Sequence, residues 1–126
     1  MVMKNNQNPV TDTLKQSNVV YQFDCNLGDC RLQSPLTSYI GETVTTLSRR
    51  LTMHLQSGAI QVHTRNEHNT NLTRDMLVKN TKILKKEKDT NRLHIYEALL
   101  IRKRKPIINN QNTGIIRIIK LFSATV

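Results

Sequence analysis

The sequence is poor in aromatic residues and in cysteine, and it has no long apolar run. Aromatic residues make up 4% of the 126 residues and tryptophan is absent, so leucine, isoleucine and valine must supply most of the buried surface. No run of about 18 apolar residues occurs, which excludes a transmembrane helix, and no apolar signal segment begins the chain. Two cysteines are too few for a disulfide scaffold. We therefore expect a reducing, intracellular location, where a cysteine pair more often binds metal.

Acidic residues are scarce relative to basic ones. Lysine and arginine total 19 against 9 aspartate and glutamate residues, and the net charge of +10 favours a polyanionic partner such as DNA, RNA or an anionic membrane. Residues 74–105 hold eleven basic and four acidic residues, whereas residues 1–73 hold six and five. This basic stretch is either a solvated face or a surface that contacts phosphates. The candidates for such contacts are Lys82, Lys85, Lys86, Arg102 and Lys103.

The apolar pattern predicts short strands and two helices within one domain. Residues 1–18 are polar and aperiodic, and we expect them to form a linker or arm. Residues 19–23 and 38–40 predict the two strands of an antiparallel hairpin, and residues 76–84 predict a third strand. A loop holding both cysteines separates the first two strands.

The first predicted helix begins near Thr45 and ends at Gly58. Its apolar stripe recurs at three- and four-residue spacing through Val44, Leu47, Leu51 and Leu55. At 100° per residue, Arg50 and His54 lie at the edge of this stripe, whereas Arg49 points away from it. Arg50 can cover the stripe with its methylene groups, or it can stabilise charge on a phosphoryl group.

The second predicted helix covers residues 91–103, with Thr90 as its N-cap and Pro106 as its stop. The apolar direction of this helix is set by Leu93, Tyr96, Leu100 and Ile101, and Glu97 points the same way. A buried carboxylate is unfavourable unless it is paired or binds a cation. Glu97 is therefore either paired with a nearby arginine or a ligand for Mg²⁺, which typically takes one or two protein carboxylates. The segment 115–122 is apolar and fits either a strand or a helix.

Tyr21 and Tyr39 end the first two predicted strands. Each is either a core residue with a satisfied hydroxyl or a group that moves protons at a phosphodiester. Taken in order with the residues above, they resemble the GIY-YIG endonucleases. The resemblance covers roughly residues 19–110 and consists of Val19-Val20-Tyr21, Tyr39-Ile40-Gly41, Leu47 to His54 with Arg50, and Glu97 followed by Pro106 and Asn109. The first motif departs from Gly-Ile-Tyr but keeps the tyrosine.

The resemblance implies a compact α+β domain at 19–110, with a small antiparallel sheet of about three strands flanked by helices and a C-terminal tail at 111–126. It implies metal-dependent hydrolysis of DNA with Mg²⁺ or Mn²⁺ held by Glu97. Arg50 would neutralise transition-state charge. Tyr21 and Tyr39 would position and deprotonate the attacking water, with Tyr21 preferred as the base, and His54 would assist proton transfer or orient a tyrosine.

Two features are most similar to the endonuclease domain of Penelope-like retroelements: the phrase Tyr-Ile-Gly-Glu-Thr at 39–43, and a cysteine pair followed by a histidine pair. The resemblance implies a structural Zn²⁺ site of Cys25, Cys30, His63 and His68. His54 is the rival for the fourth ligand. Without the resemblance this spacing is weak evidence, because His63 and His68 fall in a polar segment that we expect to be a solvated loop.

In such elements the domain follows a reverse transcriptase, and its nick exposes a 3′-hydroxyl that primes DNA synthesis. The resemblance thus implies DNA as the partner, a reverse transcriptase domain of the same polyprotein, nuclear localisation and no membrane. It also implies that this chain is an excised domain or a fragment. Two other classes stay open: a DNA-binding module with a zinc site and an inactive nuclease centre, and a structural or interaction domain.

Overall fold

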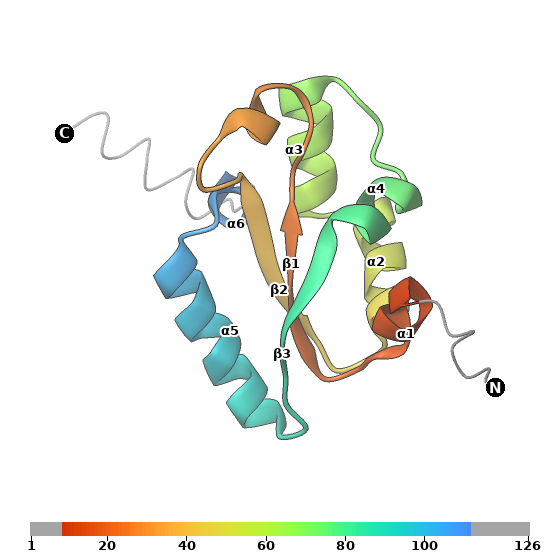
Figure 1. Cartoon of the computed structure of the whole chain (residues 1–126), viewed down its shortest axis with the longest axis vertical. Helices are drawn as coiled ribbons and strands as arrows, with labels where there is room; N and C mark the ends of the chain where they lie inside the picture. The colour runs from red at the N-terminus through yellow and green to blue at the C-terminus, as the bar shows by residue number, and fades with distance from the viewer. Residues whose placement is uncertain (1–8, 112–126) are drawn as a thin grey trace.

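The computed structural model describes residues 9–111 and has an α+β fold (Figure 1). Three strands form one antiparallel sheet, as the resemblance implies. In chain order the elements are α1 (Pro9–Lys15), β1 (Val19–Asp24), the 3₁₀ helix η2 (Gly28–Leu32), β2 (Ser38–Thr43), α2 (Leu47–Gln56), α3 (Ala59–His68), α4 (Arg74–Asn80), β3 (Thr81–Lys86), α5 (Thr90–Arg104) and α6 (Ile107–Gln111).

The central strand β1 organises the sheet, whose order is β2-β1-β3. Its β-branched and aromatic residues suit a strand that is covered on both faces. On the β2 side Tyr21 lies opposite Gly41 and Phe23 opposite Tyr39. On the β3 side the register shifts between Val20 and Tyr21.

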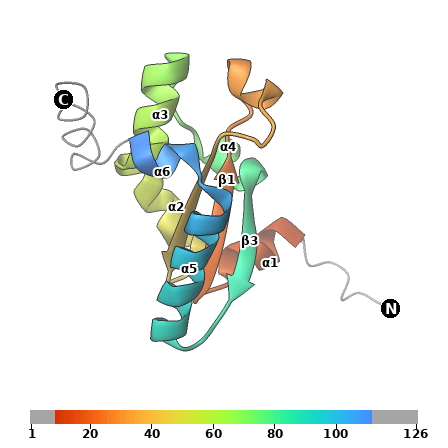
Figure 2. The same cartoon turned by 90° about the vertical axis from the view of Figure 1, so that its left-hand side faces the viewer.

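Helices cover the two faces of the sheet unequally (Figures 1 and 2). The larger apolar cluster joins Val19, Tyr21 and Phe23 of β1 to residues of α2, α3, α4 and α6. The smaller cluster joins Val20 and Ile40 to Leu93 of α5. Alternate residues of one strand therefore belong to two cores, and α5 alone closes the second.

Helix α2 confirms the predicted phase. Thr46 caps it by accepting a hydrogen bond from the Arg49 backbone N–H. Leu47 and Leu51 are buried, Arg50 is half-buried and Arg49 is exposed. Val44 precedes the helix and is exposed, so it does not belong to the buried stripe.

Helix α5 also lies close to its predicted range, but Asp89 rather than Thr90 is its N-cap, accepting a hydrogen bond from the Arg92 N–H. The helix ends where Lys105 adopts a left-handed conformation (φ 49°). Pro106 follows and cannot continue the helix.

Three predictions about local structure were wrong. Residues 9–15 form helix α1, so the segment 1–18 is not wholly a linker. The segment holding His63 and His68 is helix α3, not a loop. The third strand begins at Thr81, because residues 74–80 form a helix that Thr73 caps. The segment 115–122 lies outside the described residues, within which no helix is both long and apolar enough to cross a membrane.

Candidate functional site

A hydrogen-bonded cluster joins β1 to α2. The Tyr21 hydroxyl lies 2.6 Å from His54 Nε2, and Arg50 Nε donates a hydrogen bond to the same hydroxyl oxygen at 3.3 Å. Because the hydroxyl accepts from Arg50, its own proton is free to be donated to His54. Residues of a strand and a helix that are about 30 positions apart thus share one buried oxygen.

Tyr39 completes this cluster from β2. Its ring lies 5.3 Å from the His54 ring and 6.4 Å from the Tyr21 ring, centroid to centroid. A cavity of about 170 Å³ is lined by Tyr39, Arg50 and His54 together with the start of α3. Tyr21 is fully buried and does not line this cavity, whereas Tyr39 is half-buried at its wall.

Gly41 makes this packing of the two tyrosines feasible. A Cβ atom at position 41 would lie 2.6 Å from the Tyr21 hydroxyl oxygen and 2.9 Å from Tyr39 Cε2. Both distances are shorter than van der Waals contact, so any side chain here would displace a tyrosine. The glycine of the Tyr-Ile-Gly motif therefore makes room for the site.

Burial fixes the protonation of the cluster. It raises the pKa of Tyr21 well above its usual value, with a further contribution from Tyr39. It lowers the pKa of His54 to about 4, and the positive charge of Arg50 acts in the same direction. At neutral pH the imidazole is therefore uncharged, and His54 Nε2 can accept a hydrogen bond from the Tyr21 hydroxyl.

Glu97 lies on α5 with a second carboxylate beside it. Burial raises the pKa of Glu97 to about 7, and the negative charge of Glu42 adds to the shift. Glu42, on β2, contacts His94 Nδ1 through Oε1. Its Oε2 is buried and has no hydrogen-bond partner among the described residues. Neither Glu42 nor His94 was a sequence candidate; the available signal for Glu42 was its place in the Tyr-Ile-Gly-Glu-Thr motif.

The apolar surroundings predicted for Glu97 are confirmed. Leu93 is buried, and Tyr96, Leu100 and Ile101 pack partly buried in the same cluster. The charge of Arg50 lowers the pKa of Glu97, and the charge of Glu97 raises that of Tyr39, so Glu97 is coupled electrostatically to residues of α2 and β2. Asn109 of α6 secures that edge strand by bonding both the N–H and the C=O of Ile40 at 2.8 Å.

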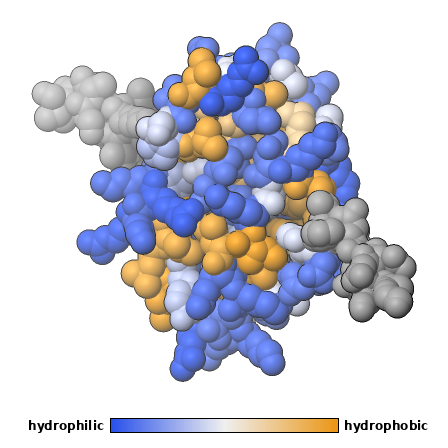
Figure 3. Space-filling view, viewed as in Figure 1, coloured by the Kyte–Doolittle hydropathy of each residue, from blue (hydrophilic) through white to orange (hydrophobic). Residues whose placement is uncertain are grey.

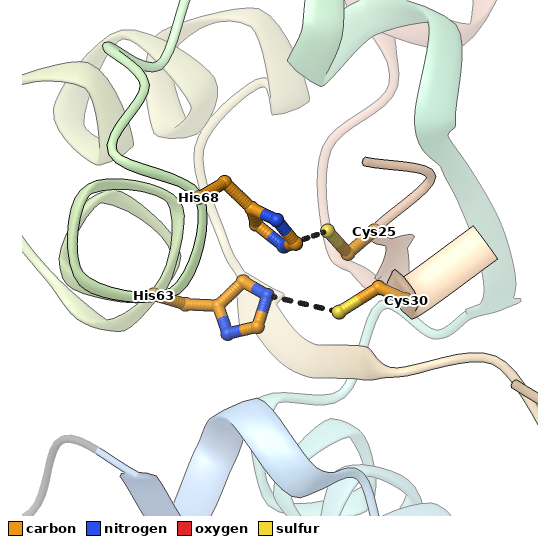
Figure 4. Close-up of side chains that lie close together, drawn as sticks. All are labelled: Cys25, Cys30, His63 and His68. Atoms are coloured by element: carbon orange, nitrogen blue, oxygen red, sulfur yellow. Dashed lines mark hydrogen bonds between the residues drawn. The ribbon is translucent and has the colours of Figure 1, made fainter. Parts of the chain in front are cut away.

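A separate cluster of four side chains could hold a metal ion (Figure 4). Cys25 follows β1, Cys30 lies in η2, and His63 and His68 come from α3. Cys25 Sγ lies 3.3 Å from His68 Nε2, and Cys30 Sγ lies 3.6 Å from His63 Nε2. One ligand atom of each residue lies within 4.8 Å of the other three.

The donor set and its dimensions suit zinc. Zn–S bonds of about 2.3 Å and Zn–N bonds of about 2.0 Å place tetrahedral ligand atoms about 3.3 to 3.8 Å apart. Burial raises the pKa of the Cys25 thiol to about 11, so it becomes a thiolate ligand only if a cation compensates the charge. His54 takes no part in this cluster, because it bonds to Tyr21.

The five predicted phosphate-contacting residues lie in different local surroundings. Lys82 and Lys103 line the same groove, where Lys82 approaches Asp24. Lys85 lies over the Tyr96 ring, and Lys86 donates to the Ser17 carbonyl oxygen. Arg102 is exposed on α5. Sequence reasoning missed Arg104 and Lys105, which line the groove with Lys103.

No protein-family profile, curated protein or solved structure matches this chain.

Proposed function

We propose that residues 19–110 form a GIY-YIG endonuclease domain, similar to that of Penelope-like retroelements, which cleaves DNA with the help of Mg²⁺ or Mn²⁺. The observation that supports this best is the convergence of Tyr21, Arg50 and His54 on one hydroxyl oxygen, with Tyr39 on the adjoining cavity. The ordered motifs select these four residues along the sequence. Motifs that matched by chance would have no reason to meet in space.

The two tyrosines have different roles in this proposal. The sequence favours Tyr21 as the base, but Tyr21 is fully buried, and this favours Tyr39, which lines the cavity, as the residue that meets substrate and water. Tyr21 then holds His54 and Arg50 in place. Neutral His54 orients Tyr21 by accepting its hydrogen bond, and Arg50 neutralises charge that develops on the phosphate.

Glu97 is the residue that would hold the divalent cation, with Glu42 beside it. The unpartnered Glu42 oxygen and the raised pKa of Glu97 both fit a pair of carboxylates that a cation would stabilise. When bound, Mg²⁺ supplies Lewis-acid polarisation of a phosphoryl oxygen. The protein itself orients the phosphate through Arg50 and positions the water through Tyr39 at the cavity wall.

The cysteine–histidine cluster is proposed as a structural zinc site. Zinc there would join the segment between β1 and β2 to α3. It would stabilise the fold without touching substrate.

Plasmid nicking tests the nuclease proposal. We expect the protein to nick supercoiled plasmid in Mg²⁺, and Glu97→Gln to lose nicking while it keeps or tightens DNA binding, because carboxylate–phosphate repulsion is relieved. Glu67→Gln is the matched control, since Glu67 is an exposed glutamate of α3. Normal nicking by a folded Glu97→Gln protein would falsify the metal assignment.

The same assay separates the alternatives. Salt-sensitive DNA binding without nicking would indicate a DNA-binding module with an inactive centre, and no binding would indicate a structural domain. A reverse transcriptase partner and nuclear localisation stay predictions that follow from the proposed family.

A further inference from the structure

A groove of about 560 Å³ lies apart from the tyrosine cluster. It is bounded by the segment between η2 and β2, by the C-terminal end of α5, and by residues of β1 and β3. Ser38 lines this groove, whereas Tyr39 lines the cavity beside Arg50. Successive residues of a strand point to opposite faces, so the groove and the proposed catalytic cavity open on opposite sides of β2.

The groove carries an excess of positive charge. Its cationic side chains are Lys82, Lys103, Arg104 and Lys105, and Asp24 is the one carboxylate among its lining residues. Asp24 already lies 3.8 Å from Lys82 Nζ and accepts a hydrogen bond from Gln22 Nε2. Lys103 and Lys105 are exposed, so an anion in the groove would meet cations that the local carboxylate does not neutralise.

Arg104 gives the groove a fixed donor. Its Nη1 donates to Gln22 Oε1 at 2.8 Å, across from α5 to β1. Gln22 in turn bonds to Asp24, so one end of the guanidinium is tied to the sheet although Arg104 is an exposed residue. A guanidinium has five N–H donors, and the others stay available for a phosphate.

Part of the lining is apolar. Pro35, Leu36 and Ile107 contribute to it, and Leu36 and Ile107 are 42% and 52% exposed. On the face that carries α5, a band of hydrophilic residues crosses the molecule between hydrophobic regions (Figure 3). Apolar surface beside cations suits a ligand that has a flat apolar body and a negative charge.

We propose that this groove binds single-stranded DNA, with successive backbone phosphates on Lys103, Arg104 and Lys105 and an unpaired base against Leu36 and Ile107. An unpaired nucleotide offers both its base face and its phosphate, whereas duplex DNA keeps the base faces stacked. The choice of DNA rests on the proposed function, since cleavage creates a free strand end near the domain. The groove would hold that end away from the cleavage cavity.

The binding of a fluorescently labelled oligothymidylate tests the groove proposal. It is measured by fluorescence anisotropy at several salt concentrations, without added divalent cation. For the double variant Lys103→Gln/Lys105→Gln we expect weaker binding and a salt slope reduced by about 1.4, which is about 0.7 for each lysine that no longer neutralises a phosphate. The control Lys79→Gln/Lys88→Gln removes the same charge from exposed sites outside the groove and should leave the slope unchanged. Melting curves confirm that both variants are folded.

Leu36→Ser probes the base contact separately. It should weaken oligothymidylate binding and leave the salt slope unchanged, because the charge of the groove stays the same. Equal slopes for the two double variants, or unchanged affinity in both groove variants, would overturn the proposal. A protein that binds the oligonucleotide through the groove but never nicks plasmid supports the groove and removes the nuclease function. A protein that nicks plasmid, but whose groove variants bind the oligonucleotide normally, supports the nuclease function and removes the groove proposal.

Discussion

The cysteine–histidine cluster and the carboxylate pair differ in how their polar groups are satisfied. In the first, each thiol lies against an imidazole, and all four ligand atoms lie within 4.8 Å of one another. In the second, Glu97 has a raised pKa beside Glu42, whose buried Oε2 has no partner among the described residues. The first arrangement suits a static cross-link. In the second, the negative charge of two neighbouring carboxylates is unfavourable, and a bound cation would stabilise it.

Strand β1 connects the two kinds of site. Tyr21, Phe23 and Cys25 alternate along one face of it and belong to one apolar cluster. Helix α2 bears His54, and α3, which follows after two residues, bears His63 and His68. The metal-ligand cluster therefore holds both chain segments that present the catalytic candidates. Substitutions in this cluster should therefore disturb the positions of the tyrosines, whereas substitutions of the carboxylates should change only their immediate surroundings.

The largest expected effect is loss of the metal cluster. If zinc is bound there, the purified protein should hold about one Zn²⁺ per chain. Chelation or Cys25→Ser should cost more than about 4 kcal/mol of stability, which is about 15 °C or more of Tm for a domain of this size. Nicking should fall with it, and added Mg²⁺ should not restore either. Metal analysis and melting curves measure both.

A matched change helps to interpret that result. His94→Ala removes a histidine from the α5 side, where it contacts Glu42, and it should leave the zinc content unchanged. His68→Ala should lower it. A metal-free protein that melts identically with and without chelator would remove zinc from this account and leave the Glu97 mechanism standing.

The next effect in size concerns two neighbouring arginines. Arg50→Ala should raise the barrier to cleavage by about 3 kcal/mol, the scale of removing one stabilising donor. Arg49→Ala should cost much less, because Arg49 is exposed and Arg50 bonds to Tyr21. Single-turnover nicking rates compare the two. A larger loss in Arg49→Ala, with both proteins folded, would contradict the assigned roles.

The elements that the sequence predicted well are those with a regular pattern of apolar residues. Strand β1 and helix α2 have unbroken patterns, and the sequence was sufficient to place Arg50 on the correct side of α2. Helix α3 buries His63 and Thr64 where an ordinary helix would bury apolar residues, and Gly58 gives it no side-chain cap. Polar residues at buried positions concealed both the helix and its metal-ligand face.

Side-chain convergence was harder to predict than secondary structure. The candidates Tyr21, Arg50 and His54 were found because the motifs are ordered along the chain. Glu42 was seen only as part of the Tyr-Ile-Gly-Glu-Thr phrase, because its proximity to Glu97 depends on how α5 crosses β2. The sequence also did not indicate that Lys86, at the end of β3, donates a hydrogen bond to the Ser17 carbonyl oxygen. Pairings between distant elements are the part that one-dimensional patterns do not contain.

The last expected effect is on stability, and it is opposite in sign to the effect of the same change on cleavage. The pKa of Glu97 is raised to about 7 in the fold, against about 4.3 in an unfolded chain. Between these values the native state binds more protons than the unfolded state, so Glu97 makes stability fall as pH rises from about 4 to about 7. Glu97→Gln removes this loss.

Without divalent cation, the Tm of Glu97→Gln should therefore increase relative to the Tm of the wild type as the pH rises from 5 to about 8. Glu67→Gln should show a constant offset, because solvent surrounds Glu67. Added Mg²⁺ at pH 8 should then raise the Tm of the wild type more than that of Glu97→Gln, since a ligand stabilises only the state that binds it. If the Tm difference between Glu97→Gln and the wild type were constant across this pH range, the fold would not disfavour the charged form of Glu97. The electrostatic argument for a cation at Glu97 would then fail, even if the zinc cluster were confirmed.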